Sequence, residues 1–246
     1  MTNTIFDSKK IPISEWIEYL LHLFEFHSIN STAYDNRNSP TTGKYWLIKT
    51  FEVLKGIQND VVLDGTVYLD ETYFTKVRSK LVTKDGKKLR GISRNKIGVG
   101  VACNETKSIF IDTGTSKPSR KSTKETYSKH IARGSVLVHD DEHSHSILIE
   151  ELELESIVYP TAETKELSDK DNPLYPVNNL HLLLKQFIRN HGAYDREHLQ
   201  DWLNLFWFIM NEPKDKYDKV LKFIEMAVLS PKKVRYRDAM SSKHSK

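Results

Sequence analysis

The stretches VYLDETYF (67–74), SVLVHDDEHSH (135–145) and PVNNLHLLLKQF (176–187) decide how this sequence is interpreted. In the first two, acidic residues directly follow a run of apolar, β-branched residues, as expected of strands that carry carboxylates to a sheet edge. The third predicts a helix that opens with paired amides, and Lys185 follows Asn178 by seven residues. Oxygen ligands from two strand ends and a helix are what a Mg²⁺ site for phosphoryl transfer requires.

The surrounding residues predict an α/β domain, a mixed sheet flanked by helices. Strands are expected over 61–74, 96–104, 108–114, 135–140 and 156–160, and helices over 122–133, 142–154, 177–190 and 195–211. The helix over 122–133 is expected to be capped by Ser122 or Thr123. The Asp-Gly pair at 85–86 predicts a turn within a basic loop.

Before residue 60 the sequence predicts a small, all-helical segment. Apolar residues recur at helical spacing over 12–28, with Ser14 as the expected cap, and again over 43–58. Helices joined by a polar turn fit a helix-turn-helix unit, although such units also occur in proteins that do not bind DNA. If this one does, its second helix is expected to contact DNA through exposed residues near its start: Thr41, Thr42, Lys44, Tyr45 and Lys49.

Charge is divided unevenly along a chain whose net charge is only +4. Residues 75–135 hold sixteen Lys and Arg against four Asp and Glu, and residues 140–171 hold eleven acids against two Lys. The acidic block is expected to be mainly solvated surface. The basic block favours a nucleic-acid partner. The expected DNA contacts of this block and of the later helix are Arg78, Lys87, Lys88, Arg90, Arg94, Lys185 and Arg189.

Length and composition limit the class of protein. A chain of 246 residues can hold one large domain, or a medium domain with a small appendage. It has no run of about 18 apolar residues and no secretory signal, so we expect no membrane partner and a cytoplasmic, nucleoid-associated location. The single cysteine, Cys103, excludes an internal disulfide and a Cys-rich zinc module.

The acidic candidates have structural explanations as well as a catalytic one. Because side chains alternate along a strand, only one of Asp70 and Glu71 can point to a given face, and both could be ordinary surface acids. Asp140 and Asp141 could cap the next helix, which its dipole favours. Against this, three successive acids at 140–142 among several histidines are costly to bring together without a cation.

The helical candidates are also ambiguous. An amide oxygen of Asn178 or Asn179 can bind Mg²⁺, but an Asn-Asn helix start is also a common cap. His181 and Lys185 lie on the helix face of Asn178, where Lys185 could contact a phosphate. Leu182, Leu183 and Leu184 are expected to supply the packing side.

In combination, several segments resemble the insertion-sequence transposases with an ISXO-type domain, members of the DDE superfamily: DETYF, VGVA, SVLVHDDEHSH, VNNLHLLLKQFIRNHGAY and LQDWLNLFWFIMN. The resemblance covers roughly residues 60–212 and implies an RNase H-like fold. It implies that Asp70, Asp140 and Asn178 are the catalytic ligands of Mg²⁺ or Mn²⁺, and that Lys185 contacts phosphate. The candidate accessory residues are Glu71, Asp141, Asn179 and His181. Relatives usually have a Cys-rich zinc ribbon, which this sequence lacks, and a Glu as the third ligand.

The resemblance further implies cleavage and strand transfer at insertion-sequence ends. The implied partners are double-stranded DNA, both terminal inverted repeats and target, and further copies of the chain in a synaptic homo-oligomer. The implied organisation is a helical DNA-binding segment (1–59), a catalytic domain (60–212) and a basic helical tail (213–246). Two alternatives stay open, a degenerate transposase that binds DNA without cutting it and an RNase H-like nuclease acting on RNA or a hybrid.

Overall fold

A computed structural model of the chain describes residues 3–7, 11–75, 82–87, 96–115, 117–168, 170–191, 198–230 and 232–240. The chain divides into two compact units. Residues 58–185 form the unit that contains the sheet, called here the sheet unit. Residues 1–57 together with 186–246 form the helical unit, so the later helices group with the N-terminal ones and not with the predicted catalytic domain.

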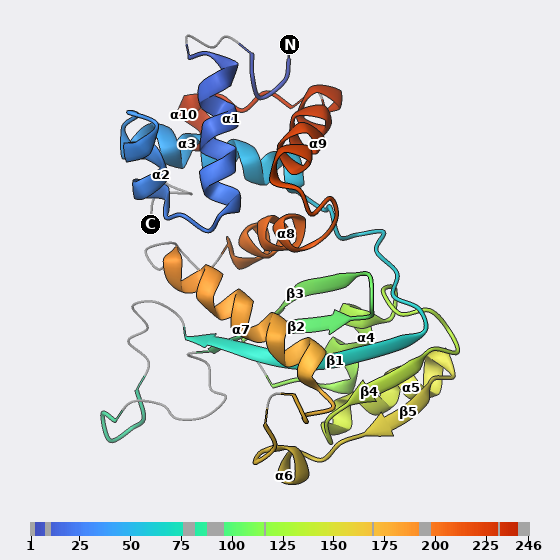
Figure 1. The fold of residues 1–246 in the computed structure, drawn as a ribbon. Helices are drawn as coiled ribbons and strands as arrows, with labels where there is room; N and C mark the ends of the chain where they lie inside the picture. The colour runs from blue at the N-terminus through green and yellow to red at the C-terminus, as the bar shows by residue number, and fades with distance from the viewer. Residues whose placement is uncertain are drawn as a thin grey trace. The chain divides into compact units, whose positions relative to one another are not determined.

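The described part of the sheet unit contains a five-stranded mixed sheet in the order β3-β2-β1-β4-β5 (Figure 1). The strands are β1 (Thr66–Thr75), β2 (Lys96–Cys103), β3 (Ser108–Gly114), β4 (Val136–His139) and β5 (Glu155–Val158). The first three pair antiparallel, whereas β4 runs parallel to β1 and β5 parallel to β4. This order and these directions are those of the RNase H-like fold, and they confirm the predicted fold class.

Helices cover both faces of the sheet (Figure 1). Alternate β1 residues, Val67 and Leu69, pack in a buried core with Tyr127 of α4 and Leu148 of α5. The first part of α7 crosses the opposite face of β1, towards which Asp70 points. The bounds of the helices in this unit are α4 (Arg120–Tyr127), η1 (His143–His145), α5 (Ser146–Leu152), α6 (Thr161–Thr164) and α7 (Tyr175–Asn190), the last of which continues into the helical unit.

The helical unit has an aromatic core. Trp16 stacks on Trp46 with ring centroids 4.4 Å apart, and the Tyr19 hydroxyl donates to the Gly43 carbonyl at 3.0 Å. Phe51 packs edge-on against Trp202 of α8, which places α8 beside α3. The helices are α1 (Ile13–Phe24), α2 (Ile29–Asp35), α3 (Pro40–Leu54), α8 (Leu199–Met210), α9 (Lys216–Leu229) and α10 (Tyr236–Ala239).

Several predicted boundaries are wrong for local reasons. The helix α4 starts two residues earlier than predicted because Ser119 and Ser122 form a reciprocal capping box, and it ends at Tyr127 instead of residue 133. The chain stops being helical there because the backbone on either side of Ile131 bonds to Leu63 as an isolated β-bridge. The polar stretch after α1 is not only a turn: Ser28 accepts from the Ser31 amide and caps α2.

Other expectations fail on single residues. Pro12, not Ser14, is the cap of α1. In α7 Leu184 is buried as predicted, but Leu182 is 62% exposed and does not belong to the packing side. The predicted turn at 85–86 is present, since Gly86 has φ +74 and its amide donates to Thr83. In the described part of the chain, every helix is too short or too polar to cross a bilayer.

Candidate active site

Asp70 and Asp140 are brought together by the pairing of two parallel strands. Leu69 of β1 is the register partner of His139 of β4, so the two aspartates follow at equivalent positions on neighbouring strands. Neither position is set by a long loop. The sheet itself therefore fixes the two carboxyl groups next to each other.

The pair is electrostatically unfavourable without a cation. Burial, together with the charges of Asp140 and Glu71, raises the pKa of Asp70 to about 7, although its Oδ1 accepts from the Glu71 amide at 2.8 Å. Burial also raises the pKa of Asp140, although its Oδ1 accepts from the Glu142 amide at 3.1 Å. Two adjacent, partly buried carboxylates are the donor set that Mg²⁺ or Mn²⁺ prefers, so the residues present fit such an ion.

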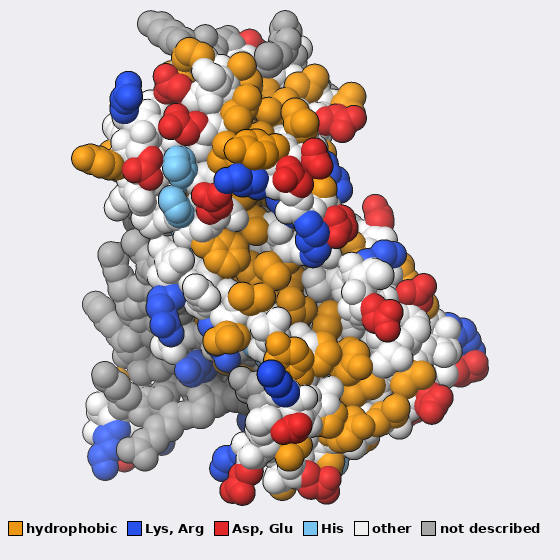
Figure 2. Space-filling view, viewed as in Figure 1, with side chains coloured by type: hydrophobic (Ala, Val, Ile, Leu, Met, Phe, Trp, Pro, Cys, Tyr) orange, Lys and Arg blue, Asp and Glu red, His pale blue; other side chains and the backbone are white. Residues whose placement is uncertain are grey.

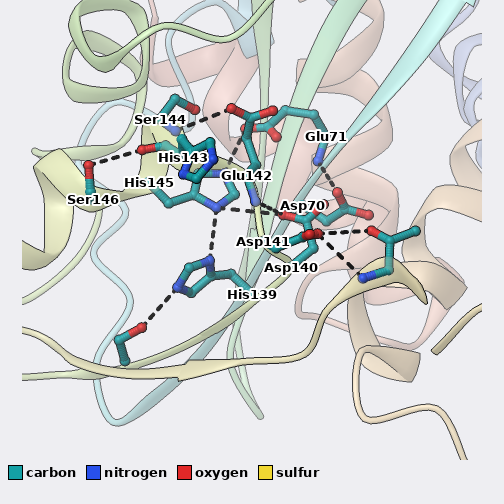
Figure 3. Close-up of polar contacts among 12 residues, drawn as sticks. Asp70, Glu71, His139, Asp140, Asp141, Glu142, His143, Ser144, His145 and Ser146 are labelled. Atoms are coloured by element: carbon teal, nitrogen blue, oxygen red, sulfur yellow. Dashed lines mark hydrogen bonds and ion pairs between the residues drawn. The ribbon is translucent and has the colours of Figure 1, made fainter. Parts of the chain in front are cut away.

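The three successive acids at 140–142 have separate roles (Figure 3). Asp140 is the one that interacts with Asp70. Asp141 is exposed and accepts from the Thr161 amide and hydroxyl at 3.4 and 3.3 Å, where α6 begins. Glu142 accepts from the Ser144 amide and caps η1. The predicted capping of the next helix by Asp140 or Asp141 is not observed, because the cap of η1 is Glu142 and α5 has no side-chain cap.

The α7 side chain that meets Asp70 is His181. Its Nδ1 lies 3.7 Å from Asp70 Oδ2, and burial, with the charge of Lys185, lowers its pKa to about 4, so the ring is neutral. At 3.6 residues per turn, Asn178 lies about 60° from His181 around the helix, whereas Asn179 lies about 160° away. Lys185 is exposed on the same side. Helix geometry therefore favours Asn178 over Asn179 as the residue facing the aspartates.

Behind the aspartates lies a layer of buried polar groups, which the sequence analysis did not resolve. Glu71 Oε1 accepts from the Tyr127 hydroxyl at 2.9 Å and lies 3.4 Å from His145 Nε2. His145 Nδ1 in turn lies 3.1 Å from His139 Nδ1, and His139 Nε2 lies 3.0 Å from Ser156 Oγ (Figure 3). Strand alternation predicted that Glu71 faces away from Asp70, but His145 and Tyr127 lie far from it in sequence and carried no local signal.

This layer is electrostatically matched, unlike the aspartate pair. Burial alone would lower the pKa of His145, but the Glu71 hydrogen bond and the charges of Asp140 and Asp70 outweigh it and raise the pKa. Burial and the neighbouring His145 lower the pKa of His139 to about 4. The acidic neighbours therefore favour positive charge at His145, whereas burial and His145 disfavour it at His139.

The residues predicted to contact DNA differ in exposure and in hydrogen bonding. The predicted exposure of Lys49 is wrong: it is 2% exposed and its Nζ donates to the Ile5 carbonyl at 2.5 Å, because this face of α3 packs inward. Tyr45 donates to the Val234 carbonyl, and the Thr42 hydroxyl pairs with Ser39. Lys44 is half-buried and Thr41 is exposed. Lys87, Lys185 and Arg189 are exposed, while Arg78, Lys88, Arg90 and Arg94 lie outside the described residues.

A second histidine cluster lies in the helical unit, and Figure 2 shows neighbouring histidines among acidic side chains on the face in view. Ligand atoms of His22, Glu25 and His27 lie within 4.8 Å of one another. The two rings are stacked, however, with planes 25° apart, and Glu25 is paired with Lys216 at 2.9 Å. We assign no metal to this cluster.

No protein-family model matches the sequence, and no curated protein matches it. The fold is similar to solved structures of Mos1 complexes. The pre-cleavage Mos1 transpososome is 14% identical over 92% of this chain and 80% of that one, with a TM-score of 0.34. The Mos1 strand transfer complex is 15% identical over 92% of this chain and 80% of that one, with a TM-score of 0.36. The Mos1 mariner paired end complex with Mn is 14% identical over 96% of this chain and 80% of that one, with a TM-score of 0.34. These similarities are distant and assign no role to any residue of this chain.

Proposed function

We propose that this chain is a DNA transposase of the DDE superfamily, which cleaves DNA at the ends of an insertion sequence and joins them to a target. The observation that carries the proposal is that Asp70 and Asp140 come at equivalent positions along neighbouring parallel strands, where their like charges repel each other. A buried acidic pair of this kind costs stability, and such costs are concentrated at functional sites.

Asp70, Asp140 and Asn178 would hold the divalent ion, with Asn178 in place of the carboxylate expected from the family resemblance. When bound, a divalent ion would lower the pKa of an attacking hydroxyl and stabilise charge on the phosphate and leaving oxygen. Asp70 and Asp140 would provide the anionic charge that draws the ion to the C-terminal end of β4, beside β1. Neutral His181, beside Asp70, adds no competing positive charge.

Exposed cations would position the DNA backbone. Lys185 lies on the α7 side of the aspartates and would contact a phosphate there. The basic block, represented by Lys87 among the described residues, and Arg189 would extend this contact. For the helical unit we keep Thr42, Lys44 and Tyr45 as proposed contacts with terminal-repeat DNA, and we propose that two ends are held by a homo-oligomer.

The test is a Mg²⁺- or Mn²⁺-dependent cleavage and joining assay on the inverted repeats that flank the coding region. We expect Asp70→Asn and Asp140→Asn each to reduce the rate by at least about 1,000-fold, or about 4 kcal/mol in barrier, while DNA binding persists. Asp141→Asn is the matched control, because this neighbouring acid is exposed and bonded to Thr161, and it should keep its activity. Full activity in Asp70→Asn would refute the site.

The same assay separates the alternatives. DNA binding without any metal-dependent nicking of the repeats would support a degenerate transposase. This alternative is worth testing because Asn178, an amide, stands where the family resemblance predicts a third carboxylate. Cleavage of RNA in a hybrid without joining would support an RNase H-like nuclease instead.

A further inference from the structure

Next to the aspartate pair, two buried histidines turn the same ring atom towards each other. His139 Nδ1 and His145 Nδ1 are 3.1 Å apart, and Asp140 Oδ1 lies 3.8 Å from His145 Nδ1 (Figure 3). One ligand atom from each of the three residues lies within 4.8 Å of the other two. Ligand atoms around a tetrahedral zinc ion are about 3.3 Å apart, so these separations suit one ion.

The outer nitrogens of both rings have fixed partners. His145 Nε2 lies 3.4 Å from Glu71 Oε1, and a carboxylate can only accept, so this nitrogen carries a proton. His139 Nε2 lies 3.0 Å from Ser156 Oγ, which can accept in the same way. With Nε2 donating, each ring can bind a metal through Nδ1 once the proton shared by the two Nδ1 atoms is displaced. A carboxylate or hydroxyl behind a histidine is the usual support of a metal ligand.

We infer that His139, His145 and Asp140 form a second cation site, for a divalent ion of the zinc type, distinct from the Mg²⁺ site proposed above. Imidazole nitrogens favour Zn²⁺, Co²⁺ or similar ions over Mg²⁺, which prefers oxygen. The ion would displace the proton shared by the two Nδ1 atoms, bind both nitrogens from one side, and also bind Asp140. The site goes beyond the proposed function, with which it shares only Asp140, and it would orient that carboxylate.

The experiment uses the full chain, stripped with a chelator and titrated with Co²⁺ alone. We expect saturable binding with the visible absorption of low-coordinate Co²⁺, reversed by Zn²⁺ and kept in excess Mg²⁺. His139→Gln and His145→Gln should each weaken binding by more than about 100-fold, since even second-layer partners contribute 10–100-fold. The matched control is His143→Gln, because His143 is exposed two residues from His145 and should leave binding unchanged.

A substituted buried histidine could unfold the chain, so a milder variant is needed. Ser156 lies on the exposed strand β5, and Ser156→Ala should keep the fold while weakening Co²⁺ binding about tenfold. Absence of Co²⁺ absorption in the unaltered protein would overturn the inference, and a single shared proton would then join the facing nitrogens. Equal binding by folded Ser156→Ala and the unaltered protein would also overturn it.

One further variant separates this inference from the proposed function. Asp70→Asn should abolish cleavage but leave Co²⁺ binding intact, because Asp70 is not among the three ligands. A protein that binds Co²⁺ through both histidines yet never cuts DNA would refute the transposase proposal alone. A protein that cuts DNA with Mg²⁺ but shows no Co²⁺ absorption would refute the second site alone.

Discussion

The helical unit and the sheet unit both bury charged side chains, but their surroundings differ. In the helical unit Lys219 Nζ donates to the carbonyls of Phe208, Ile209 and Asn211 at 3.0, 2.6 and 2.7 Å. In the sheet unit Asp70 accepts one amide hydrogen bond and has two further acids as neighbours. One buried charge meets complementary dipoles, and the other meets charges of its own sign.

We interpret the first as a structural charge and the second as one that serves the proposed function. Lys219 satisfies carbonyls at the C-terminal end of α8, where the helix dipole favours a cation. Burial lowers the pKa of Lys219 to about 8, but at neutral pH the ammonium still donates its hydrogen bonds. The Asp70–Asp140 pair gains nothing comparable within the described protein, so it is expected to reduce the stability of the metal-free chain.

The largest effect on stability should come from removing the structural cation. Lys219→Met leaves three buried carbonyl oxygens without this donor, and we expect a loss of about 3 kcal/mol in the free energy of unfolding. Denaturant unfolding measures it. Lys222→Met is the matched control on the same helix, where the exposed side chain reaches one carbonyl at 3.1 Å, and it should cost much less. Equal losses of unfolding free energy in the two variants would show that the buried Lys219 contributes no more than the exposed Lys222.

Removing the charge of Asp70, the proposed metal ligand, should change the free energy of unfolding in the opposite direction. The pKa of Asp70 is about 7 in the folded chain, above its unfolded value, so the metal-free protein loses stability as pH rises from about 4 through 7. Because 24% of the Asp70 side chain is exposed, we expect Asp70→Asn to stabilise the metal-free chain by only about 2 kcal/mol at pH 8 and negligibly at pH 4.

Thermal unfolding at several pH values, with and without Mg²⁺, checks this prediction. Mg²⁺ should raise the Tm of the unaltered chain at pH 8 and have little effect on Asp70→Asn, since a ligand stabilises only the state that binds it. Asp141→Asn provides the control. Hydrogen bonds from Thr161 lower the pKa of the Asp141 carboxyl, so its ionised form does not destabilise the folded chain. A destabilised Asp70→Asn variant at pH 8 would contradict the functional interpretation.

A smaller effect is expected in the layer behind the aspartates. Tyr127→Phe removes the hydroxyl that donates to Glu71 at 2.9 Å, and we expect a loss of about 1.5 kcal/mol. A double-mutant cycle with Glu71→Gln isolates this contact. If the two effects simply add, the hydrogen bond makes no net contribution and the layer is less well matched than its geometry indicates.

Exposed pairs should have the smallest effect. Arg120 and Glu150 form an ion pair at 2.6 Å, but their side chains are 50% and 59% exposed. Arg120→Ala should leave the free energy of unfolding within experimental error, because solvent and salt screen such pairs. A large loss would mean that surface charge, and not the buried groups, dominates the electrostatics of this unit.

Local patterns in the sequence were sufficient to predict the bounds of some strands of the sheet. The strand β3 spans 108–114 as predicted, and β2 differs from its prediction by one residue, since apolar runs broken by turns are a short-range signal. Lys49 shows the limit. Its charge and its place on α3 predicted exposure, but the partner that buries it, the Ile5 carbonyl, lies 44 residues away.

By itself the sequence determined which residue types could form the site and which side of β1 each would occupy, because alternation along a strand is a local property. Only the tertiary structure decided which of the three acids at 140–142 meets Asp70, since that depends on the register of β1 with β4 and on the loop that turns Asp141 towards Thr161. It also decided that His181 is the α7 residue against Asp70 and that His139 and His145 face each other. Contacts between distant segments arise from packing, which no local pattern encodes.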